Sequence, residues 1–120
     1  MENLHIEPSQ TLPEIKLSNG HASFEGNIIP EDARKFFAPI LEWFNTYDSN
    51  TIKLECTLFY INTSSTACLY DIFKSLNNKN IKTNLKWCYE EDDLDMKEMG
   101  EMMNDRFPCI DIEFIEIQPL

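Results

Sequence analysis

The chain has 120 residues and a mass of 14.1 kDa, and 42% of its residues are apolar. This length and composition suit one folded domain over residues 1–120 and argue against disorder. Ten basic residues stand against 21 acidic ones, a formal net charge of -11, so the surface should repel the phosphates of nucleic acids and anionic lipids. Nucleic acid binding is therefore not expected.

The acidic residues are concentrated near the end of the chain. Between Glu90 and Glu116 there are eleven acids and two bases. Such a run usually forms a solvated surface, and the alternative is a face that steers a basic protein partner toward the molecule. The sequence leaves both interpretations open.

The cysteines and the apolar runs indicate the compartment. The four cysteines lie 12, 20 and 21 residues apart without a CxxC pair, which predicts reduced thiols in the core: Cys56, Cys68, Cys88 and Cys109. The chain does not open with a basic segment followed by an apolar one, and no apolar run approaches the about 18 residues of a membrane span. We therefore expect a cytoplasmic protein without membrane insertion.

A hairpin and a helix are predicted first. Asn19-Gly20 separates two short alternating runs, residues 15–17 and 22–24, and this dipeptide is a strong signal for a tight β-hairpin. A short strand over residues 4–6 fits in front of it. Residues 30–47 place apolar side chains three or four positions apart, which predicts an amphipathic helix, with a kink or a short break near Phe36 because Pro39 removes a backbone donor.

The rest of the chain alternates between strand and helix patterns. Strands are predicted over residues 51–61, 82–89 and 110–117, and helices from the hydroxyl run to about Asn78 and within the acidic segment, where Met96, Met99 and Met103 form a packing stripe. Residues 51–61 become apolar on both faces toward their end. This pattern predicts a central strand whose carboxyl end is covered on both sides.

The predicted order is ββ(β)αβαβαβ, which indicates an α/β fold with a mixed sheet, an N-terminal hairpin and helices packed on the sheet. In the alternating half the strands should be parallel. Functional sites of such sheets collect beyond the carboxyl ends of the strands. The segment Asn62-Thr63-Ser64-Ser65 lies at one of these ends.

Catalytic patterns are not found in the sequence. The two histidines, His5 and His21, are not in a metal-ligand pattern, and no Gly-rich phosphate loop or G-x-S-x-G segment is present. No two carboxylates are singled out as an acid and base pair. We expect no catalytic residue, no metal and no cofactor. A hydrolase that uses scattered carboxylates or Cys68 is the weaker alternative.

The hydroxyl run Thr63-Ser64-Ser65 has two interpretations. A Ser or Thr at a helix start accepts a hydrogen bond from an unpaired backbone N–H, which is worth about 1 kcal/mol. The same position also favours a phosphate, because the N-terminus of a helix attracts negative charge. Capping and phosphorylation both remain open on these residues alone.

The sequence resembles the SiaC family of bacterial regulatory phosphoproteins, which is related to the anti-sigma factor antagonists of STAS fold. The resembling segments are LHIEPSQTLPEI, PEDARKFFAPILEWFNTY, LECTLFYINTSSTACLYDIF and LKWCYEEDDLDMKEMGE. In the family the Thr of an Asn-Thr-Ser-Ser segment accepts the phosphate. The resemblance therefore implies a STAS-like fold and phosphorylation at Thr63, with Ser64 as the second choice, while Ser64 and Ser65 are the expected caps.

The resemblance also implies partners. A serine/threonine kinase of the anti-sigma type would add the phosphate, a PP2C-like phosphatase would remove it, and the unphosphorylated protein would bind a target such as a diguanylate cyclase. The expected partner face surrounds the site and includes Tyr60, Asn62, Ser64 and Ser65. The alternative is a small-ligand-sensing STAS-type module with a pocket between Asn62 and the next crossover.

Overall fold

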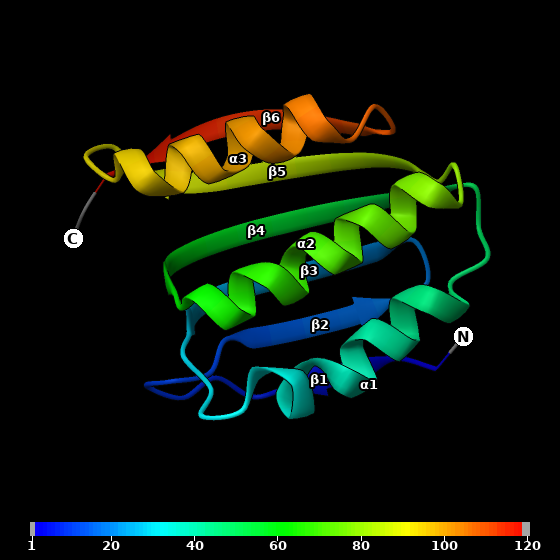
Figure 1. Ribbon diagram of the computed structural model, residues 1–120, viewed down its shortest axis with the longest axis horizontal. Coiled ribbons are helices and arrows are strands. Elements are labelled where there is room, and N and C mark those ends of the chain that lie inside the picture. Colours follow the sequence, from blue (N-terminus) through cyan, green and yellow to red (C-terminus); the bar gives the residue numbers. More distant parts are fainter. Residues whose placement is uncertain (1, 119–120) are drawn as a thin grey trace.

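The computed structural model describes residues 2–118, which form one six-stranded sheet and three helices (Figure 1). The order βββαβαβαβ is the predicted one, and it includes the short first strand. The elements are β1 (Leu4–Ile6), β2 (Glu14–Ser18), β3 (His21–Ile28), α1 (Ala33–Thr46), β4 (Thr51–Ile61), α2 (Thr63–Asn78), β5 (Lys82–Glu90), α3 (Leu94–Arg106) and β6 (Ile110–Ile117).

The strands lie in the sheet in the same order as in the chain. The first three pair antiparallel, and β3, β4, β5 and β6 pair parallel, as predicted. Each helix connects two neighbouring parallel strands, so all three crossovers turn the same way and α1, α2 and α3 lie on one face of the sheet (Figure 1). We call the other face the open face. The prediction that the end of β4 is covered on both sides is therefore wrong.

The core lies between the sheet and the helices. Side chains of β4 alternate, so that Ile52, Leu54, Cys56 and Leu58 are buried against the helices while Lys53 is exposed on the open face. The helices contribute matching apolar stripes, and burial of each large side chain is worth about 1.5–3 kcal/mol. The buried helical residues include Phe37, Ile40, Phe44, Cys68, Leu69, Ile72, Phe73, Leu76, Met96 and Met103.

Helix α1 runs through Pro39 without interruption, so of the kink or short break predicted near Phe36 the break does not occur. Its N-cap is Asp32, whose carboxylate accepts a hydrogen bond from the Lys35 N–H at 3.1 Å. At the other end, the Lys79 ammonium donates to the carbonyls of Phe44, Asn45 and Tyr47 at 2.6, 3.0 and 2.8 Å. Lys79 thus ties the end of α2 to the last carbonyls of α1, of which that of Phe44 also accepts the Tyr47 N–H at 3.3 Å.

Helix α3 packs closely on β5 and β6. The Trp87 indole N–H donates to the Met96 carbonyl at 2.9 Å. A Cβ atom at Gly100 would come within 2.7 Å of the side chains of Trp87 and Phe114, so only glycine allows this close approach. Among residues 2–118, no helix has the length and apolar character needed to cross a membrane.

Candidate functional site

Asn62 joins β4 to α2 and fixes the position of the junction. Its backbone N–H donates to the Ile28 carbonyl at 3.0 Å, and its side-chain amide donates to the Pro30 carbonyl at 3.4 Å. The first contact ties the junction to the end of the neighbouring strand β3, and the second ties it to the segment that follows β3. The start of α2 and the approach to α1 therefore lie side by side at the carboxyl edge of the sheet.

Asn62 is also the N-cap of α2. Its side-chain oxygen accepts a hydrogen bond from the Ser65 N–H at 3.0 Å, and its carbonyl accepts from the Thr66 N–H at 3.0 Å and the Thr66 hydroxyl at 3.1 Å. The prediction that Ser64 and Ser65 cap the helix is wrong, because both residues already lie within its first turn. Asn directly before the first helical residue was the signal for the cap.

The three hydroxyl residues differ in exposure. Thr63 is the first residue of α2 and is exposed, as is Ser64, whereas Ser65 is fully buried. The amides of Thr63 and Ser64 precede the first intrahelical hydrogen bond, so they point toward any anion at this helix end. The Ser65 hydroxyl makes no hydrogen bond within residues 2–118 and lies beneath the surface rather than in a partner face.

The edge around Thr63 is rich in acidic side chains. All three helices begin at this edge of the sheet (Figure 1). Glu31 and Asp32 lead into α1, and the acidic residues 90–93 lead into α3. Arg34, at the start of α1, pairs with Asp71 of α2 at 3.1 Å. A phosphate on Thr63 would therefore add negative charge to an edge that is already negative.

A β-bulge shapes the end of β4. Gly26 of β3 pairs with Leu58, but the next residue, Asn27, pairs with Tyr60, so Phe59 is the extra residue. Leu58 is buried, Ile61 packs against the core, and the two residues between them, Phe59 and Tyr60, are 43% and 56% exposed. Side chains therefore stop alternating between the two faces after Leu58, and two neighbouring aromatic side chains are exposed just before the junction.

The cysteines are packing residues rather than nucleophiles. All four are free; three are buried and Cys109 is partly exposed. Burial raises the pKa of the Cys56, Cys68 and Cys88 thiols, so they remain protonated and unreactive. This outcome agrees with the predicted packing role for Cys56 and Cys68, which lie in the core. Cys88 is buried on the open face instead, and the prediction is wrong for Cys109, which is partly exposed.

Both histidines lie beside carboxylates, which the sequence spacing did not predict. His5 contacts Glu14 at 3.1 Å and Glu7 at 3.6 Å, but through its two different ring nitrogens. His5, Glu7 and Glu14 each offer one ligand atom within 4.8 Å of the others, but His5 and Glu7 are exposed, and exposed acidic groups of this kind are common on protein surfaces without a metal. His21 lies 3.8 Å from Glu55.

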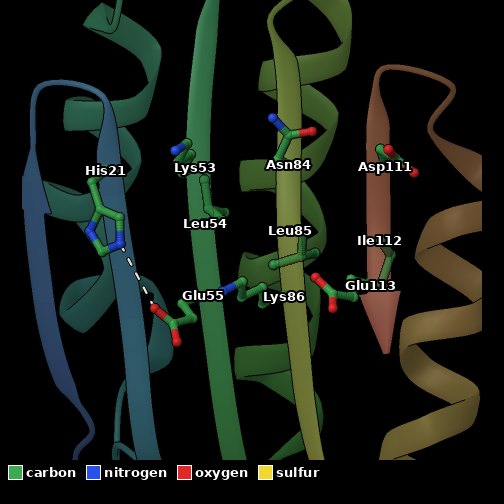
Figure 2. Close-up of a pocket in the computed structure, with 10 residues that line it drawn as sticks. All are labelled: His21, Lys53, Leu54, Glu55, Asn84, Leu85, Lys86, Asp111, Ile112 and Glu113. Atoms are coloured by element: carbon green, nitrogen blue, oxygen red, sulfur yellow. Dashed lines mark ion pairs between the residues drawn. The ribbon is translucent and has the colours of Figure 1, made fainter. Parts of the chain in front are cut away.

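A hollow of about 350 Å³ lies on the open face (Figure 2). His21, Glu55, Lys86 and Glu113 come from four neighbouring strands there, so basic and acidic side chains alternate across the sheet. This hollow lies toward the opposite end of β4 from Asn62. It does not coincide with the ligand pocket that the sequence suggested.

Comparison with known proteins identifies the family. A model of the SiaC family of regulatory phosphoproteins matches residues 6–117. The chain belongs to the SiaC family. This membership agrees with the expected non-enzymatic, regulatory role. One relative, an uncharacterized protein of Pseudomonas aeruginosa strain UCBPP-PA14, is 27% identical over 109 residues, which span 84% of this chain and 86% of the relative.

Solved SiaC structures share the fold. Apo-SiaC of Pseudomonas aeruginosa superposes with a TM-score of 0.83 at 24% identity, covering 96% of this chain and 99% of that one. A chain from the crystal structure of the diguanylate cyclase SiaD in complex with its activator SiaC, also from Pseudomonas aeruginosa, gives a TM-score of 0.86 at 24% identity, covering 95% and 99%. The predicted α/β fold is thus confirmed.

Proposed function

We propose that this protein is a cytoplasmic switch that binds a target protein when Thr63 is unphosphorylated and releases it when Thr63 carries a phosphate. The main support is the combination of an exposed threonine at the first position of a capped helix with two exposed aromatic side chains three and four residues before it. The hydroxyl is accessible to a kinase, and the aromatic residues offer apolar area to a partner.

The fold tolerates the phosphate at this position. Asn62, not Thr63, supplies the cap, so modification of Thr63 leaves the hydrogen bond to the Ser65 N–H in place. The free amides at the helix start favour an anion. The phosphate therefore acts on the surface of the protein and not through unfolding of α2.

The phosphate weakens binding because burying it under a partner costs free energy. It brings nearly two negative charges and a larger volume to the place where a partner would pack against Thr63. A partner that covers this edge must remove water from those charges and fit around the phosphoryl oxygens. Arg34 is already paired with Asp71, which limits the compensation available from α1.

The partners we propose follow from the family. The SiaC chain of Pseudomonas aeruginosa forms a complex with the diguanylate cyclase SiaD as its activator. For the present chain we propose a diguanylate cyclase as the target, a serine/threonine kinase of the anti-sigma type and a PP2C-like phosphatase. Ser64, exposed and one position later, is the second choice of acceptor.

Substitutions at Thr63 test this proposal. We expect Thr63→Ala to bind a diguanylate cyclase from the same cells as wild type does and to resist the kinase, as measured by intact mass. Thr63→Asp should weaken the complex by roughly tenfold or more, about 1.4 kcal/mol, in calorimetry. Ser64→Ala, at the exposed position of the second-choice acceptor, is the control and should behave as wild type in both assays. Modification of Thr63→Ala at wild-type rate would refute the assigned acceptor.

A further inference from the structure

The open face of the sheet has two ends of different chemistry. At the end near the amino termini of the parallel strands, the hollow of Figure 2 alternates basic and acidic side chains. At the carboxyl end the side chains on this face become apolar. We call this second region the apolar end; it comprises Phe59, Tyr60, Ile115 and Ile117, together with Cys88, which is buried between them.

Strand register places these residues on one surface. Thr57 pairs with Cys88, and Cys88 pairs with Ile115, which forms one row across three strands. Ile117 lies two residues beyond Ile115 and pairs with Glu90. Since side chains two apart share a face, this second row extends the first toward the edge. Phe59 continues the Thr57 side of β4, and the bulge leaves Tyr60 exposed beside it.

The apolar end is not needed to complete the core. The core is formed on the helix face, and the open face has no helix in residues 2–118 to cover it (Figure 1). Phe59 and Tyr60 expose about half of their surface, and Ile115 and Ile117 are only partly buried. Neighbouring exposed aromatic and aliphatic side chains of this kind mark an interaction surface.

Acidic side chains border the apolar end. Glu25 pairs with Thr57, Glu90 pairs with Ile117, and Glu113 lies two residues before Ile115 on the same face. Within residues 2–118 none of these three carboxylates forms an ion pair with a basic side chain. The border therefore complements a basic partner.

We propose that the apolar end binds an amphipathic α-helix of a partner protein. The apolar side chains of that helix would pack on Phe59, Tyr60 and Ile115, and its lysines or arginines would lie against the acidic border. A helix is the element that covers sheets in this architecture, and one more would give the sheet a second helical layer. Phe59 and Tyr60 also belong to the partner face of the proposed switch, so the inference rests on the proposed function and adds the kind of partner element that binds there.

A model peptide tests the chemistry directly. The probe is a peptide of about 18 residues, five helical turns, with leucine on one face and lysine on the other. A matched peptide carries glutamate in place of lysine. We expect the lysine peptide to shift the NMR signals of residues 59–60, 88 and 115–117 of the full chain, and the glutamate peptide to shift none of them.

A substitution at Met102 is the control for the substitutions at Phe59 and Tyr60. Met102 on α3 is 42% exposed, close to the 43% of Phe59, and also lies among acids. Phe59→Ser with Tyr60→Ser should weaken peptide binding by roughly tenfold or more, and Met102→Ser by less than about twofold. Glu25→Gln with Glu90→Gln, which leaves every apolar contact in place, should weaken binding and reduce its dependence on salt.

Three results would overturn the inference. The first is equal binding of the lysine peptide to the Phe59/Tyr60 and Met102 variants, or no binding at all. The second is a set of shifts confined to α3. The third is a wild-type dimer in sedimentation that the Phe59/Tyr60 substitutions convert to a monomer, since the occupant would then be a second copy of the chain. None of these measurements involves a phosphate on Thr63, so the helix-binding surface and the switch at Thr63 can fail independently of each other.

Discussion

The two faces of the sheet use apolar side chains for different purposes. On the helix face the apolar residues of β4 and β5 are almost completely buried against three helices. On the open face the strands carry charged side chains at one end and partly exposed apolar ones at the other. The same strand β4 contributes to both faces. Apolar residues on the helix face stabilise the fold, whereas those beside Thr63 are exposed, and we propose that they bind a partner.

Two Phe→Ala substitutions test this contrast, and one of them has the largest expected effect on the free energy of unfolding. Phe73 of α2 is fully buried on the helix face, so Phe73→Ala should lower the free energy of unfolding by about 3–5 kcal/mol. Phe59→Ala on the open face should change it by less than about 1 kcal/mol. Urea denaturation followed by circular dichroism measures both values. A large loss for Phe59→Ala would place Phe59 in the core and contradict the contrast.

The junction between the two faces is tested by Asn62→Ala. This substitution removes the cap of α2 and the contact to the Pro30 carbonyl, so we expect a loss of about 1–2 kcal/mol in the same denaturation assay. Ser64→Ala, inside the first turn and exposed, should stay within about 0.5 kcal/mol of wild type. The reverse order of effects would restore Ser64 as the cap.

The smallest expected effect is at Ser65, whose hydroxyl is buried without a hydrogen bond in the described part of the chain. Ser65→Ala removes an unsatisfied polar group and adds a residue with higher helix propensity. We expect stability to rise by a few tenths to about 1 kcal/mol. A loss of more than 1 kcal/mol would show that the Ser65 hydroxyl has a partner that the fold depends on.

Much of the fold could be predicted from local sequence signals. Period-2 and period-3.6 patterns gave every strand and helix, and Asn19-Gly20 gave the hairpin turn between β2 and β3. Helix α2 begins at Thr63, with only Asn62 between it and the strand that ends at Ile61, and thus within the hydroxyl run as expected. These features depend on residues close together in the chain, which is why the sequence reveals them.

Features that depend on distant residues were missed. The bulge at Phe59 arises where β4 pairs with β3 at Gly26, which has a positive φ of 119°, and periodicity within β4 alone contains no signal for it. The open face is uncovered because of the order of the strands in the sheet, and patterns within single segments of the sequence do not reveal that order. The identity of the cap was available in principle, because Asn62 stands directly before the helix.

The most direct test of the switch compares one protein in two states. Chain carrying phosphothreonine only at position 63 and unmodified chain are titrated separately into a diguanylate cyclase from the same cells, and both the Kd and the cyclase activity are measured. We expect the unmodified chain to bind and raise the activity, and the phosphorylated chain to bind at least roughly tenfold more weakly. Equal affinity of the two forms would contradict control of this complex at Thr63.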